Sequence, residues 1–260
     1  MINPQSKSIE YYNVFIERIG NNGTISELEY KRALKSLSND QSIEAICAIG
    51  LAHALVGREV DAINWFKTLT PFTNLFVLKS FGVVLRHFGR NKELINLSLG
   101  YADHFRDVWF SWMSMEYYYI IGDISNSARK AREFLNMLHN NDNKKHAEYS
   151  ITQQLNSLSL VYSSGYCTPE QFKEISDLVM DILDNHGYAF RYIELFYYEG
   201  EGASYEVGID LDKDDFNTLS VLNTEVVKRM IEIKDLDNCD LTPCFSCDGM
   251  SNWRYIHGTK

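Results

Sequence analysis

The end of the chain carries the densest group of residues whose types could bind a metal. Cys239, Cys244, Cys247 and His257 follow one another with the spacing C-x4-C-x2-C-x9-H. Thiolates and imidazole are preferred ligands of tetrahedral zinc, and short connections between ligands cost little closure entropy. We therefore expect either a zinc site at these four residues or, as the simpler interpretation, a tail with incidental thiols.

Two other metal motifs are incomplete. The three tail cysteines share the spacing of plant-type iron–sulfur ferredoxins, but no cysteine follows them to supply the fourth ligand. Asp210, Asp212 and Asp214 begin like a calcium-binding EF-hand loop, yet Asp215 replaces the required glycine and Val221 the bidentate glutamate. These aspartates are more typical of a strand end that leads into an acidic helix N-terminus.

Motifs of catalysis are missing from the sequence. Its seven histidines are scattered without a paired metal-ligand spacing, and it has neither a G-x-S-x-G motif nor a glycine-rich phosphate loop after a strand. We therefore expect a protein that is not an enzyme.

Charge and composition limit the partners. The formal net charge of −10 argues against a broad nucleic-acid-binding face and favours a basic partner. No apolar run approaches the roughly 18 residues of a membrane span, and the first residues do not resemble an export signal. Five cysteines, an odd number, do not suggest a secreted disulfide framework. We expect a cytoplasmic protein with reduced thiols that binds neither nucleic acid nor membrane.

A repeat organises the first half of the chain. Gly23, Gly57, Gly89 and Gly122 are spaced 34, 32 and 33 residues apart. Each glycine separates two stretches with the apolar period of a helix, as in a helical hairpin in which glycine supplies the left-handed conformation of the turn. Since one hairpin cannot bury both of its apolar faces, the sequence predicts several hairpins stacked on one another.

The clearest copy is SIEAICAIGLAHALVGREVDAINWFKTLTPFTNL, which begins at Ser42. It resembles the tetratricopeptide repeat. Gly50 matches the small residue of the first helix, Gly57 the turn, Ala62 the small residue of the second helix, and Phe66 the large residue between hairpins. The resemblance implies a close approach of the two helices at Gly50.

The other copies are degenerate. Gly82 and Gly89 repeat the spacing of Gly50 and Gly57, and Tyr118 and Gly122 agree with the pattern in the following copy, although Met115 replaces the small residue there. The copy around Gly23 keeps only the turn and the apolar period. The resemblance extends roughly over residues 9–138.

The resemblance also implies a function. In this family the concave surface of the stacked hairpins, an α-solenoid, binds peptides or helices of other proteins, and here it would carry His53, Arg86 and Tyr118. We therefore expect an adaptor or chaperone-like protein that holds a segment of a basic partner. Two alternatives are an acidic inhibitor of the immunity or antitoxin type, and a metal-dependent or redox-responsive regulator that acts through the tail cysteines. The sequence leaves the oligomeric state open.

The character of the sequence changes twice beyond these copies. The polar run NNDNKK after His139 predicts a loop, after which Thr168 as N-cap and Pro169 at the first helical position open the second helix of a fifth hairpin. This helix ends at Gly187. The helical array is thus predicted to span residues 1–187.

A small β-β-α subdomain is predicted over residues 188–235. Tyr205, Val207 and Ile209 alternate with polar or small residues, and Gly200 and Gly202 mark the turn of a β-hairpin. The hairpin should pack on the array or join a further strand. A helix follows, and its apolar stripe should cover one face of the hairpin: Phe216, Leu219, Leu222, Val226, Val227 and Met230. Residues 236–260 form the cysteine-containing tail.

Overall fold

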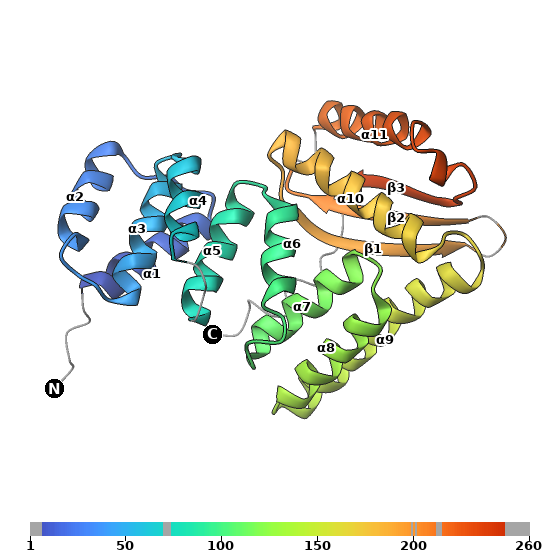
Figure 1. Cartoon of the computed structure of the whole chain (residues 1–260), viewed down its shortest axis with the longest axis horizontal. Helices are drawn as coiled ribbons and strands as arrows, with labels where there is room; N and C mark the ends of the chain where they lie inside the picture. The colour runs from blue at the N-terminus through green and yellow to red at the C-terminus, as the bar shows by residue number, and fades with distance from the viewer. Residues whose placement is uncertain (1–6, 70–73, 199, 201, 212–214, 248–260) are drawn as a thin grey trace. The chain divides into compact units, whose positions relative to one another are not determined.

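The computed structural model describes residues 7–69, 74–198, 200, 202–211 and 215–247. The protein is mainly helical and has a small three-stranded sheet near its C-terminus (Figure 1). It divides into two compact units, Met1–Arg90 and Asn91–Lys260, which we call unit 1 and unit 2. The change of composition at Tyr188 therefore falls inside unit 2. No described helix combines the length and the apolar character that crossing a bilayer requires.

Unit 1 is built around one helix that is apolar on all sides. This helix, α3, packs against all four of the other helices of the unit. Its sequence IEAICAIGLAHAL leaves no polar face to present to solvent, so burial on every side is the expected outcome. The helices of unit 1 are α1 (Lys7–Gly20), α2 (Glu27–Leu37), α3 (Ile43–Leu55), α4 (Glu59–Lys67) and α5 (Leu75–His87).

The hairpin turns repeat one local conformation. Gly57, Gly89 and Gly122 have φ of 81°, 62° and 80°, the left-handed region that glycine adopts at little cost. After each of them the next N–H bonds a carbonyl five residues back, for example Arg58 N to His53 O at 2.9 Å. At the first turn Asn22, with φ of 52°, takes this place, so the prediction for Gly23 was off by one residue.

Unit 2 begins with helices α6 (Asn91–Gly100), α7 (Val108–Ile120), α8 (Ile124–Met137), α9 (Asn141–Ser163) and α10 (Pro169–His186). The predicted caps of α10 are confirmed, because Thr168 accepts from Gln171 N and Gly187 is left-handed with φ of 73°. The predicted NNDNKK loop is wrong, since α9 runs through it. Asn140 caps this helix by accepting from Asp142 N and Asn143 N, and its polar first turns face solvent.

The sheet contains the predicted hairpin and one strand that the sequence analysis missed. Strands β1 (Phe190–Tyr198) and β2 (Gly202–Ile209) pair antiparallel, with positive φ at Gly200 in the turn and at Gly202, the first residue of β2. Strand β3 (Leu241–Ser246) adds parallel to β2, so the order is β1-β2-β3. The sequence analysis treated Leu241–Ser246 as part of a tail, whereas it completes the sheet.

The last long helix, α11 (Phe216–Ile231), does not cover the hairpin as predicted. It packs against α10, β3 and a short 3-10 helix, Lys234–Leu236, while α10 lies across the sheet (Figure 1). Leu222 and Val226 are buried, but Phe216 is 66% and Val227 50% exposed. The stripe read from the sequence was therefore too wide, because only its centre contacts the protein core.

The apolar face of the sheet is anchored by Tyr205. This side chain is fully buried, with its ring centroid 5.3 Å from that of Phe172 of α10. Its hydroxyl donates a hydrogen bond of 3.2 Å to the carbonyl of Ile120, at the end of α7. A buried tyrosine needs such a partner, and the bond fixes the sheet against the helical part of unit 2.

Candidate functional site

A groove of about 300 Å³ lies between α1 and α2 in unit 1. Tyr11, Val14 and Phe15 contribute its apolar side chains from α1, where the i, i+3, i+4 spacing places them on one face. From α2, Glu29 and Arg32 point to the same groove. The remaining lining residues belong to α1 and are charged: Lys7, Glu10 and Arg18.

The floor and rim of the groove have different roles. Phe15 is buried and packs on Tyr11, with ring centroids 5.5 Å apart, whereas Val14 is 44% exposed and open to a ligand. Arg18 bonds Glu29 at 3.2 Å and so joins the two helices at the rim. The backbone N–H of Ser26, followed by its hydroxyl and by Arg18, lowers the pKa of Glu29. The groove thus offers an apolar contact inside a charged border.

The packing between α3 and α4 depends on Gly50. A Cβ at this position would lie 2.3 Å from Cε2 of Phe66 and 2.9 Å from Cδ1 of Trp65, closer than carbon atoms can approach. Ala62 and Phe66 are fully buried, and Phe66 stacks on Phe81 of α5 with centroids 5.3 Å apart. The small residue of the first helix therefore admits the aromatic residue of the second. Gly82 is likewise buried in α5.

The three residues expected on a concave surface have different surroundings. His53 lies between α2 and α4: its Nδ1 is 3.1 Å from the Tyr30 hydroxyl, its ring is 6.2 Å from that of Trp65, and burial lowers its pKa. Arg86 is half-buried near the end of α5. Tyr118 belongs to α7 of unit 2, where it lies close enough to Arg129 to interact with its charge. None of the three lines the groove between α1 and α2.

Two of the tail cysteines, Cys239 and Cys244, have different surroundings. Cys244 lies in β3 in register with Glu206 of β2, and burial raises the pKa of its thiol. Cys239 lies beside Cys167 instead. Within the described ranges, no three side chains of histidine, cysteine, aspartate or glutamate gather to hold a metal ion. The fourth candidate ligand, His257, lies outside these ranges, as do Asp212 and Asp214 of the EF-hand-like run.

The pair of Cys167 and Cys239 was missed by the sequence analysis. The hydrogen bond between the two thiols raises the pKa of Cys167 and lowers the pKa of Cys239. Cys167 is buried and Cys239 half-buried, and neither is in a disulfide. Sequence spacing could not reveal the pair, because α10, the β-hairpin and α11 separate the two residues along the chain.

One face of the sheet carries two carboxylates side by side. Glu194 of β1 is directly opposite Glu206 of β2. Burial, and then the charge of Glu206, raises the pKa of Glu194. Glu206 accepts hydrogen bonds from Tyr192 at 3.0 Å and from Ser246 at 2.6 Å, which compensate part of the repulsion between like charges. These hydrogen bonds explain the presence of Glu206 by a structural role. The pair of glutamates alone therefore does not indicate a catalytic or binding site.

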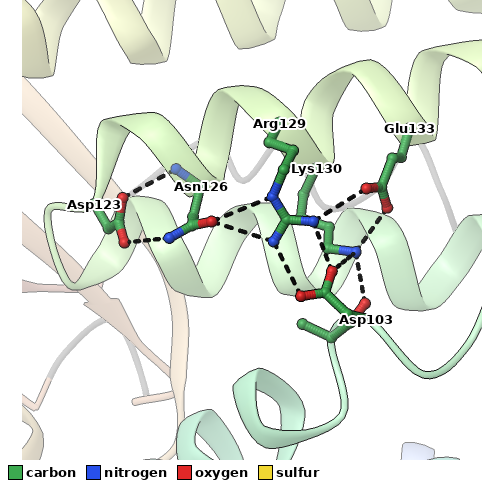
Figure 2. A network of polar contacts seen from close by, with 7 residues as sticks. Asp103, Asp123, Asn126, Arg129, Lys130 and Glu133 are labelled. Atoms are coloured by element: carbon green, nitrogen blue, oxygen red, sulfur yellow. Dashed lines mark hydrogen bonds and ion pairs between the residues drawn. The ribbon is translucent and has the colours of Figure 1, made fainter.

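A charged network along α8 has a structural role (Figure 2). The side chain of Lys130 is buried, and its Nζ lies 2.6 Å from Glu133, 2.9 Å from Asp103 and 2.6 Å from the carbonyl of Ala102. Arg129 bonds Asp103 at 2.6 Å, and these two cations lower the pKa of Asp103 to about 2. The network fastens the turn after α6 to α8. Asp123 and Asn126 continue it to the N-cap of that helix (Figure 2).

No family model, no curated protein and no solved structure matches the chain. The interpretation of the groove, the thiol pair and the repeated hairpins therefore depends on their geometry.

Proposed function

We propose that the protein is an adaptor or chaperone-like interaction protein that holds a segment of another protein in the groove between α1 and α2. The observation that carries the proposal is the exposed Val14 beside the buried Phe15, enclosed by charged side chains from two helices. Binding sites for protein segments combine an apolar anchor point with a polar rim in this way.

The packing of unit 1 supports this proposal. The first helices of successive hairpins, α1, α3 and α5, pack on one another in order, while α2 packs on α3 and α4 packs on both α3 and α5. We infer that these hairpins form a tetratricopeptide-like solenoid, in which a groove along the helices remains open for a ligand. The ring of Phe66 packs directly against Gly50, and a tetratricopeptide-like repeat requires this close contact between its two helices.

Charge sets what kind of segment would bind. The net charge of −10 favours the approach of a basic partner. The groove itself is mixed, with Lys7 and Arg32 beside Glu10, while Arg18 and Glu29 pair with each other. We therefore expect a segment that inserts an apolar side chain at Val14 and carries charges of both signs around it.

Substituting one valine tests this assignment. Val14→Glu should remove specific partners from a pull-down out of native lysate, because it places a carboxylate in the apolar part of the groove. Val60→Glu is the matched control, since Val60 is 70% exposed on α4 and does not line the groove. Quantitative mass spectrometry of the captured proteins makes the comparison, with circular dichroism to confirm that both variants fold. A prey list that Val14→Glu leaves unchanged would contradict the groove as the binding site.

A further inference from the structure

The segments that contain Cys167 and Cys239 are held side by side in unit 2. The backbone N–H of Asp240 donates to the carbonyl of Tyr166 at 2.7 Å, which joins the immediate neighbours of the two cysteines. A second bond, from Gln171 Nε2 to the carbonyl of Asp235 at 2.6 Å, joins the same segments farther along. The approach of the two cysteines is therefore fixed by the fold on both sides.

The two thiols contact each other and differ in access. They share a hydrogen bond, and the N–H of Leu241 also bonds the sulfur of Cys239. Cys167 is only 4% exposed, whereas Cys239 is half-buried and open to small molecules. One reachable thiol backed by a buried second thiol is the arrangement of an attacking and a resolving cysteine.

We propose that Cys239 and Cys167 form a reversible dithiol–disulfide pair that reacts with hydrogen peroxide or an organic hydroperoxide. This inference does not depend on the groove in unit 1. The sequence spacing groups Cys239 with Cys244 and Cys247, whereas this proposal pairs it with Cys167.

The reaction balances in two steps. The Cys239 thiolate attacks one oxygen of the peroxide, the O–O bond breaks, and Cys239 becomes a sulfenic acid while the other oxygen leaves as hydroxide or alkoxide. The sulfur of Cys167 then attacks the Cys239 sulfur and displaces its oxygen, which takes up the Cys167 proton and leaves as water. Overall, two thiols lose two electrons and two protons to the peroxide. A dithiol reductant reverses the bond by thiol–disulfide exchange.

The bond would connect two elements of the sheet region. Cys167 directly precedes Thr168, the N-cap of α10, and Cys239 lies just before β3. Strand β3 is held by its pairing with β2 and by the bond from Ala203 N to Asp240 O at 3.0 Å. Oxidation would therefore fasten β3 to the start of α10 and close a long loop of chain, which stabilises the folded state relative to the unfolded chain.

Peptide mapping of the oxidised wild-type protein tests the pair. The native protein is treated with excess hydrogen peroxide, quenched with catalase, then unfolded and alkylated. We expect two fewer maleimide adducts than the five of the reduced protein. Cleavage before aspartate separates Cys239 from Cys244, because Asp240 lies between them, so the linked peptide identifies the partner. A dithiol should restore all five adducts, and the oxidised protein should unfold at a higher temperature than the reduced one.

Three variants separate the roles of the two thiols. With Cys167→Ser, Cys239 should remain a sulfenic acid that dimedone labels; with Cys239→Ser, the buried Cys167 should take no label. Cys244→Ser is the matched control and should still give the linked peptide. Five adducts after peroxide treatment, or a bond from Cys239 to Cys244 or Cys247, would overturn the proposal. Peptide mapping of the oxidised wild-type protein tests the proposed disulfide even if a variant fails to fold.

Discussion

At the scale of single residues, the unusual carboxyl group is that of Glu116 in α7. Burial raises its pKa to about 7, and the amide of Gln154, 3.5 Å away, offsets this only in part. A half-buried glutamate whose pKa is raised in this way keeps its proton in the folded protein at pH values at which the unfolded chain has already lost it. The sequence gives no sign of this, since α7 is dominated by apolar and aromatic residues and Glu116 is its only acid.

The pH dependence of stability should report on Glu116. The pKa of Glu116 is higher in the folded protein than in the unfolded chain. The stability that the protonated carboxyl contributes to the folded state is therefore fully present below pH 4.5, the unfolded value, and is lost as the pH rises through about 7. Glu116→Gln cannot ionise, so above pH 7 it should be more stable than the wild type by about 1–3 kcal/mol. Urea unfolding between pH 4 and pH 8 measures this, with Glu148→Gln on the exposed side of α9 as the control. Parallel pH profiles for wild type and Glu116→Gln would contradict it.

The packing around Gly50 could be predicted from the sequence, whereas the surroundings of Cys167, Cys239 and His53 could not. The close packing at Gly50 was expected from the resemblance of Gly50, Gly57, Ala62 and Phe66 to the tetratricopeptide repeat, and all four residues lie within one hairpin. The contact between Cys167 and Cys239 depends on how α10 and β3 come together, and no local pattern encodes that. His53 could be placed on a helix but not on a face, since α3 is apolar all round and gives no amphipathic direction.

At the scale of elements, the pairing of α3 with α4 depends on the absence of one methyl group. Gly50→Ala should destabilise unit 1 by about 1–3 kcal/mol, because its Cβ would overlap the ring of Phe66, which is fully buried. Gly20→Ala is the matched control: nothing lies within 4 Å of its Cβ, and it should be neutral or stabilising by up to about 1 kcal/mol. Denaturant unfolding compares the two. Equal stabilities of the two variants would show that the close approach has no energetic consequence.

Helix boundaries with strong capping signals were predictable, and those set by tertiary context were not. Thr168, Pro169 and Gly187 define α10 by local chemistry that the structure confirms. The run NNDNKK joined α9 because an asparagine cap and solvent exposure compensate for its poor helix propensity. Strand β3 carries a proline and a cysteine in LTPCFS, so its strand character comes from pairing with β2 and from burying Leu241 and Phe245.

At the scale of the whole molecule, the predicted helical character is confirmed, and the division after Arg90 was not foreseen. The glycine repeat passes through this division without interruption, since Gly89 and Gly122 form the same turn on either side of it. A repeat in local conformation therefore does not determine where compact units begin and end. That depends on how side chains fill the space between elements, and each unit here has a core of its own, around α3 in unit 1 and around Tyr205 in unit 2.

Separate cores predict separate responses to substitution. In calorimetry, Gly50→Ala should lower only the unfolding transition of unit 1, while Lys130→Met should lower only that of unit 2. Lys130→Met keeps the aliphatic stem but removes the buried ammonium group and its bonds to Asp103, Glu133 and the carbonyl of Ala102, a loss of about 1–3 kcal/mol. Arg132→Met, exposed on the same helix, should change stability by less than about 0.5 kcal/mol. If both substitutions shifted one common transition, the two units would unfold as a single cooperative body, and a partner bound in the α1–α2 groove would then stabilise the sheet and its cysteines as well.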